Sequence, residues 1–147
     1  MVRCKDGFTA HGNPDAFYSG GSYFARKASY SHHYAYRSDD VAGAAANPQG
    51  PFHHLILAQV LCGRSKREQE PWPQEQRRRP GYWKAVLGDQ FDSVLGGPHL
   101  PRPGAPAADR SEMYVVYTSS QTLPEYVVSY QVRGPGAGGM PALALAG

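Results

Sequence analysis

Gly20-Gly21-Ser22-Tyr23-Phe24-Ala25, followed by Ser31-His32-His33-Tyr34, gives the clearest indication of this protein's fold. The run that follows the two glycines, 22–25, is short and apolar, which predicts a β-strand. Residues 27–37 contain neither Gly nor Pro, and two of their tyrosines lie one helical turn apart. This spacing predicts a helix over 27–37, so the segment is expected to be a strand that leads into a helix.

Further strands are predicted downstream. Residues 53–62 form a continuous apolar run, which is typical of a strand buried on both faces. Residues 126–132 alternate with a period of two, which predicts a strand with two unlike faces. Short strands are also predicted at 82–87, 91–95 and 113–118. Several strands with one main helix indicate an α+β domain built on antiparallel sheet.

Glycine and proline mark the segments between these elements. The chain has 17 Gly and 13 Pro, and many of them fall at 96–108 and after residue 133. The polar segment 64–81 is predicted to be an exposed loop, and 96–108 a loop of the same kind. Residues 134–147 are rich in Gly, Pro and Ala, which predicts a flexible tail. We therefore expect one domain over residues 1–133, followed by this tail.

Composition restricts the class of protein. A chain of 147 residues with 41% hydrophobic residues is long enough for one domain with a real core. The net charge of +3 is too small to indicate nucleic-acid binding. Only Cys4 and Cys62 occur, and no apolar run reaches membrane-spanning length. We expect an intracellular protein of the nucleus or cytoplasm, without a disulfide framework or a membrane partner.

The order of these motifs resembles the catalytic domain of the poly(ADP-ribose) polymerase family, in particular its mono-ADP-ribosylating branch. The segment 18–34 is similar to the family's nicotinamide-binding signature, and Phe91-Asp92-Ser93-Val94 resembles its Tyr-Asp-Ser segment. Residues 113–117 and 123–128 resemble the closing strands. The resemblance runs in order from about residue 7 to residue 132. It implies the C-terminal part of an ADP-ribosyltransferase fold, with an antiparallel split sheet.

The resemblance also implies which residues form the site. Tyr23 would be the tyrosine of the family's His-Tyr-Glu triad, Ser31 would bind the carboxamide of nicotinamide, and Tyr34 would stack on its ring. A hydroxyl and an aromatic ring three residues apart on a helix share one face, which suits these roles. Without the resemblance, core packing would explain the tyrosines equally well. The NAD⁺-binding residues implied by the signature are Gly21, Ser22, Tyr23, Phe24, Ala25, Ser31 and Tyr34.

The implied activity is NAD⁺-dependent protein mono-ADP-ribosylation, with protein side chains as acceptors and release of nicotinamide. Met113 stands where polymerising members of the family have a catalytic Glu. Glu112 precedes it by one residue, so on a strand it points to the opposite face. A thioether cannot polarise a hydroxyl as a carboxylate does. The resemblance therefore implies transfer of a single ADP-ribose without chain elongation.

The family's catalytic His lies in an N-terminal strand that has no match in this chain. Residues 8–18 correspond to the loop that covers bound NAD⁺, so His11 is expected to be an exposed loop residue. Two alternatives stay open: an inactive binding or scaffold module on the same fold, and an incomplete product that does not fold alone. We expect weak or no automodification by the polypeptide itself.

The paired histidines His32-His33 and His53-His54 do not predict a metal site. Adjacent histidines diverge by about 100 degrees on a helix and point to opposite faces on a strand. No Cys or carboxylate lies at ligand spacing. We interpret them as surface or hydrogen-bonded side chains.

Overall fold

The computed structural model describes residues 16–40 and 50–132. His11 and the expected tail 134–147 lie outside the described residues. The elements, in chain order, are β1 (Ser22–Ala25), α1 (Ala28–His32), β2 (Tyr36–Arg37), β3 (His53–Val60), β4 (Ser65–Glu68), α2 (Gln74–Arg77), α3 (Tyr82–Leu87), β5 (Ser93–His99), β6 (Ser111–Val116) and β7 (Thr122–Tyr130). Short 3-10 turns occupy Ser38–Asp40, Ala107–Asp109 and Ser119–Gln121.

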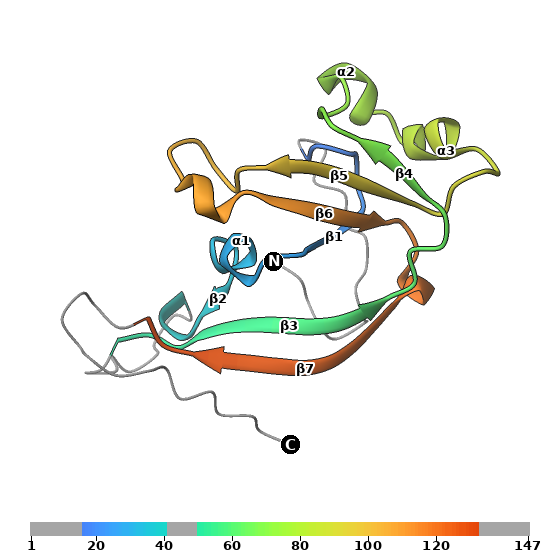
Figure 1. The fold of residues 1–147 in the computed structure, drawn as a ribbon. Helices are drawn as coiled ribbons and strands as arrows, with labels where there is room; N and C mark the ends of the chain where they lie inside the picture. Colours follow the sequence, from blue (N-terminus) through green and yellow to red (C-terminus); the bar gives the residue numbers. More distant parts are fainter. Residues whose placement is uncertain (1–15, 41–49, 133–147) are drawn as a thin grey trace.

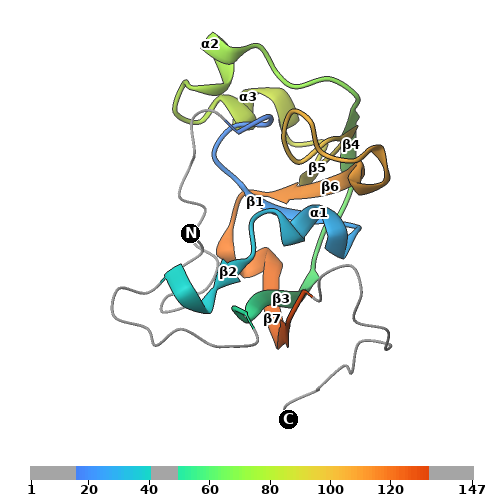
Figure 2. The same ribbon diagram turned by 90° about the vertical axis from the view of Figure 1, so that its left-hand side faces the viewer.

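Two sheets make up the fold (Figure 1). The first has the strand order β1-β6-β5-β4, in which only the β4–β5 pair is parallel. The second has the order β2-β3-β7 and is antiparallel throughout. Helix α1 contacts both β1 and β3, and the two views place it between the sheets (Figures 1 and 2). The structure has the expected α+β class, but the expected antiparallel sheet is wrong for β4 and β5, which pair in parallel. No helix within the described residues is long and apolar enough to cross a bilayer.

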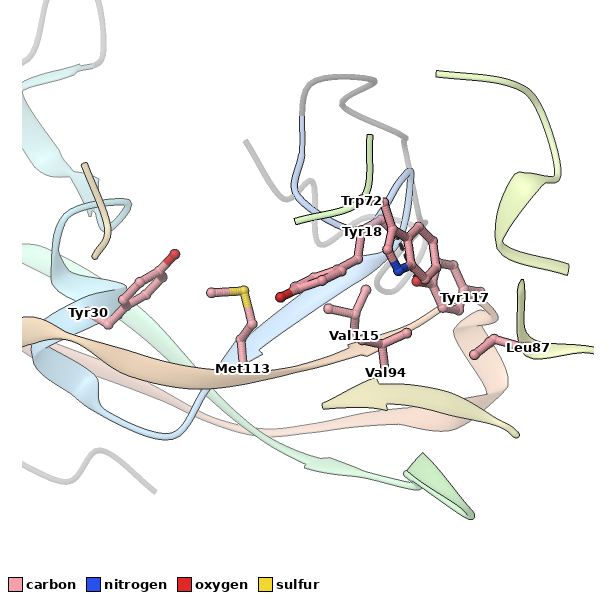
Figure 3. Packing of buried hydrophobic residues seen from close by; sticks show 8 residues of the cluster. All are labelled: Tyr18, Tyr30, Trp72, Leu87, Val94, Met113, Val115 and Tyr117. Carbon is pink, nitrogen blue, oxygen red and sulfur yellow. Dashed lines mark hydrogen bonds between the residues drawn. The ribbon is translucent and has the colours of Figure 1, made fainter. Parts of the chain in front are cut away.

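The hydrophobic core lies on one face of the four-stranded sheet (Figure 3). Met113, Val115 and Tyr117 alternate along β6 and its continuation, so their side chains share that face. The chain before β1 packs over it through Tyr18, which is 0% exposed. The buried cluster consists of Tyr18, Tyr30, Trp72, Leu87, Val94, Met113, Val115 and Tyr117.

The predicted helix over 27–37 is wrong in its length. Helix α1 ends at His32, and a tighter turn follows in which the N–H of Tyr34 donates to the carbonyl of Ser31 at 2.9 Å. The chain then becomes β2, where Tyr36 pairs with His54 of β3. The pairing with β3 therefore overrides the local helical spacing.

The prediction of an exposed loop over 64–81 is wrong in its secondary structure, although most of the segment is exposed. Residues 65–68 form β4, a strand parallel to β5, and 74–77 form α2. Strand β4 is an edge of its sheet, and charged side chains are usual on edge strands. Trp72, between β4 and α2, is 6% exposed and belongs to the core.

Residues 82–87 were predicted to be a strand but form helix α3. Tyr82, Trp83, Val86 and Leu87 pack against or within the core, which is the pattern of one helical face. The helix ends at Gly88, whose φ of 55° suits glycine.

The strand predicted at 91–95 is β5, which begins at Ser93 and continues to His99. The loop expected over 96–108 therefore begins later than predicted. Gly96 is buried, and a Cβ there would overlap the Tyr18 ring. This close approach explains why glycine occurs within a strand.

The strand predicted at 53–62 is β3, but its burial on both faces is wrong, because Leu57 is 55% exposed. Its partner β7 begins at Thr122, earlier than the predicted 126. A register shift beside Leu57 lets Pro124 take part in β7. The predicted alternation of two unlike faces holds over 127–130, where exposed and half-buried residues alternate. It fails at Tyr126, which is 50% exposed and lies beside the register shift.

Candidate functional site

Strand β1 fixes the position of Tyr23. Its backbone pairs with Val115 of β6, and the ring packs against the core. The Tyr23 hydroxyl donates to the carbonyl of Ser19 at 2.9 Å and accepts from the N–H of Tyr18 at 2.8 Å. Burial raises the pKa of Tyr23 well above its ordinary value, so the hydroxyl stays protonated. In this structure the hydroxyl holds the segment before β1.

The neighbours of Tyr23 in the signature act through backbone pairing. Ser22, Phe24 and Ala25 pair with Val116, Tyr114 and Met113 of β6. Gly21 allows the close approach of β6, since a Cβ there would lie 2.6 Å from Val115 Cγ1. These residues determine where β1 lies, and thereby where Tyr23 and α1 lie.

Ser31 and Tyr34 lie at and just after the end of α1. Tyr34 is 65% exposed, and its hydroxyl donates to the carbonyl of Pro101. Among residues 16–40 and 50–132, the Ser31 hydroxyl makes no hydrogen bond. One backbone hydrogen bond links Ser31 and Tyr34. The Ser31 hydroxyl and the exposed Tyr34 ring are thus available to a ligand.

Tyr30 is a residue that sequence reasoning assigned no role. It is 8% exposed, and its ring centroid lies 5.7 Å from that of Tyr34. Burial raises the pKa of Tyr30, and the Tyr34 hydroxyl raises it further. Within the described residues no ring contact or hydrogen bond joins Tyr23 to Tyr34, whereas the Tyr30 ring packs against the Tyr34 ring.

Met113 does not lie in an open site. It is 1% exposed and lies among the core side chains, with Tyr30 on one side and Tyr18 on the other (Figure 3). Glu112 is outside the core, with its carboxylate 2.6 Å from the Arg26 guanidinium and 2.9 Å from that of Arg67. Both arginines lower the pKa of Glu112. The two neighbours therefore occupy different environments.

Tyr18 is the second residue that sequence reasoning did not single out. Its hydroxyl lies 2.6 Å from Nε2 of His99, and its ring packs edge-on against Trp72. Its carbonyl accepts the Tyr117 hydroxyl at 2.8 Å. Burial raises the pKa of Tyr18 to about 12. The part of the expected covering loop that the structure describes is thus docked on the core through Tyr18.

Most of the histidines considered for metal binding have other partners. His32 Nδ1 lies 2.6 Å from the Tyr130 hydroxyl, His33 Nε2 lies 2.8 Å from Asp109, and His54 Nδ1 lies 2.8 Å from Ser129. Within the described ranges, no three His, Cys, Asp or Glu side chains come together in a way that suits a metal ion.

The chain is similar to the human protein mono-ADP-ribosyltransferase PARP12, with 28% identity over 113 residues. The similar region covers 77% of this chain and 12% of the human protein. No family model matches the chain. The α+β architecture, with mixed and antiparallel sheets and few helices, is compatible with an ADP-ribosyltransferase-like fold. Similarity at this level suggests a poly(ADP-ribose) polymerase-like catalytic segment that spans about an eighth of the relative's length.

Proposed function

We propose that this chain belongs to an NAD⁺-dependent protein mono-ADP-ribosyltransferase, with nicotinamide bound at Ser31 and Tyr34. The observation that carries the proposal is the exposed Tyr34 ring, three residues after Ser31, whose hydroxyl makes no hydrogen bond within the part of the chain that the structure describes. The similarity to a human mono-ADP-ribosyltransferase supports the same activity.

The residues fit nicotinamide by their chemistry. A hydroxyl can donate to and accept from a carboxamide, and a tyrosine ring can stack on a flat pyridinium ring. The hydrogen bond from Tyr34 to Pro101 and the packing against Tyr30 hold the ring in one orientation. A ring fixed before binding loses little conformational entropy when the ligand arrives.

The reaction breaks the bond between ribose C1′ and the nicotinamide nitrogen, whose electron pair returns to the pyridine ring. An acceptor oxygen or nitrogen then forms the new bond to C1′ and releases its proton. Positive charge develops on the ribose in the transition state and needs a nearby dipole or anion. Buried Met113 supplies neither, and Glu112 is engaged by Arg26 and Arg67. Transfer is therefore slow and stops after one ADP-ribose.

A second candidate is an inactive module on the same fold. It is favoured by the Tyr18 ring, which packs over the face of β5 and β6 that also carries Met113. A binding module would keep NAD⁺ affinity at Tyr34 without releasing nicotinamide.

The test measures NAD⁺ binding by calorimetry and nicotinamide release by chromatography on the full chain. Tyr34→Ala and Ser31→Ala should each weaken binding, by about tenfold for a loss of roughly 1.4 kcal/mol. Tyr36→Ala, at another exposed tyrosine close by in sequence, is the matched control and should bind like the wild type. Binding without release favours the inactive module. Equal binding by wild type and Tyr34→Ala would contradict both candidates.

A further inference from the structure

An open pocket of about 510 Å³ lies away from Ser31 and Tyr34, at the other end of α1. It is bounded by the end of β1, the start of β6 and the segment between β5 and β6. Figures 1 and 2 both place that segment beside α1. The residues that line the pocket are Arg26, Lys27, Pro98, Ala107, Arg110, Ser111 and Glu112.

The lining is predominantly cationic. Arg26, Lys27 and Arg110 face one carboxylate, that of Glu112. Glu112 is already neutralised by Arg26 together with Arg67, which approaches from β4. The guanidinium of Arg110 has neither a hydrogen-bond nor an ion-pair partner among residues 16–40 and 50–132. The pocket therefore has positive charge that the described chain does not satisfy.

Two polar groups of the pocket, those of Ser111 and Lys27, are held in place by the fold. The hydroxyl of Ser111, which is 2% exposed, accepts the N–H of Lys27 at 3.1 Å. The ammonium group of Lys27 donates to the carbonyl of Ala108 at 3.1 Å. These bonds tie the start of α1 to β6 and to the segment that carries Arg110. Lys27, which is held in this way, loses less conformational entropy on binding an anion than a mobile surface side chain would.

The pocket and the Tyr34 ring are joined by short stretches of chain. Lys27 immediately precedes α1, and Tyr34 comes two residues after its end; α1 itself has 5 residues and is roughly 7.5 Å long at about 1.5 Å per residue. On the other side, Pro101 contacts Tyr34 while Pro98 lines the pocket. An extended peptide of about three residues covers such a distance at roughly 3.3 Å per residue.

We propose that this pocket binds an acidic segment of a protein and, resting on the proposed function, that this protein is the acceptor of ADP-ribose. Guanidinium groups bind carboxylates through paired, charge-assisted hydrogen bonds, which suits Arg110. The open shape admits a peptide chain. Glu112 within the lining disfavours a continuous row of phosphates, so a nucleic acid fits the pocket poorly.

The experiment measures fluorescence anisotropy of a labelled peptide of alternating Gly and Glu, titrated with the full chain without NAD⁺. A peptide with Gln in place of Glu reports binding that does not depend on charge. We expect the Glu peptide to bind and the Gln peptide not to bind. Arg110→Glu should weaken binding by about tenfold or more, and Lys27→Gln should weaken it less.

The matched control is Arg102→Glu, which makes the same charge change in the same segment outside the pocket lining. Circular dichroism confirms that each variant is folded. Equal weakening by Arg102→Glu and Arg110→Glu, or equal binding of both peptides, would overturn the proposal. Displacement of the peptide by ADP would also overturn it, because the pocket would then bind phosphate groups. Since the assay omits NAD⁺, its failure is separate from a failure to release nicotinamide.

Discussion

The carbonyl oxygen of Ser19 accepts a hydrogen bond from the Tyr23 hydroxyl at 2.9 Å. The same hydroxyl accepts the N–H of Tyr18 at 2.8 Å, so one side chain holds two consecutive backbone units. Tyr18 and Ser19 are both buried, at 0% and 4% exposed. The residue that the family resemblance marks as part of the triad is thus also a structural clamp.

Replacing Tyr23 with Phe removes both hydrogen bonds and leaves the N–H of Tyr18 buried without a partner. An unsatisfied buried donor costs about 1–3 kcal/mol, so we expect the free energy of unfolding to fall by that amount. Urea denaturation measures it. Tyr126→Phe, at a residue that is 50% exposed, is the control and should change stability by less than about 0.5 kcal/mol. Equal stability of Tyr23→Phe and wild type would show that the clamp contributes nothing.

Ser19 has a φ of 65°, in the left-handed region. Gly adopts that conformation without strain. Strain of about 1–2 kcal/mol on Ser exceeds the entropic cost of Gly, roughly 0.5–1 kcal/mol. Ser19→Gly is therefore expected to raise the melting temperature, and Ser19→Val to lower it. Calorimetry that finds Ser19→Gly less stable would show that the Ser side chain contributes more than the strain costs.

The sequence predicts correctly those elements whose pattern is local. It does not predict elements that form only by pairing with strands distant in the sequence. Strand β1 was predicted with its correct bounds, because glycines precede an apolar run. Strand β4 was missed because its charged residues belong to an edge that only its pairing with β5 creates. Helix α3 was misassigned although Tyr82, Trp83, Val86 and Leu87 have helical spacing, which was a usable signal.

The candidate site likewise has features that the sequence could predict and features that it could not. Ser31 and Tyr34 lie near each other because a single turn of chain joins them, so their proximity was predictable. The role of Tyr18 was not, because it depends on Trp72 and His99, more than fifty residues away in sequence. The burial of Met113 likewise results from side chains of other elements, Tyr18 and Tyr30, which lie on either side of it in the core.

Glu112 makes the stability of the folded protein depend on pH under acidic conditions. Arg26 and Arg67 hold the pKa of its carboxyl below the ordinary value in the folded state. Because the pKa of this carboxyl is lower in the folded protein than in the unfolded chain, its ionised form stabilises the fold. This stabilisation is fully present above the pKa of the unfolded chain and is lost as the pH falls through the pKa of the folded protein. Melting temperatures of the wild type should therefore fall below about pH 4 more steeply than those of Glu112→Gln. Added salt should reduce the difference, because the ion pairs are exposed. Parallel curves for the two proteins would exclude this contribution.

Met113→Glu tests whether the family's polymerising residue can simply be restored. Met113 is 1% exposed, and its neighbours in the core are apolar or aromatic. A fully buried carboxyl has its pKa raised by about 3 units, which costs roughly 4 kcal/mol at neutral pH. Because the folded pKa is raised, the cost is absent below the unfolded pKa and grows as pH rises above about 4.

Met113→Leu conserves volume and should cost less than about 1.5 kcal/mol. We therefore expect Met113→Glu to be much less stable at pH 7 than at pH 4 and to form no ADP-ribose chains. A variant that is stable at neutral pH and elongates chains would mean that Met113 faces an open site in solution.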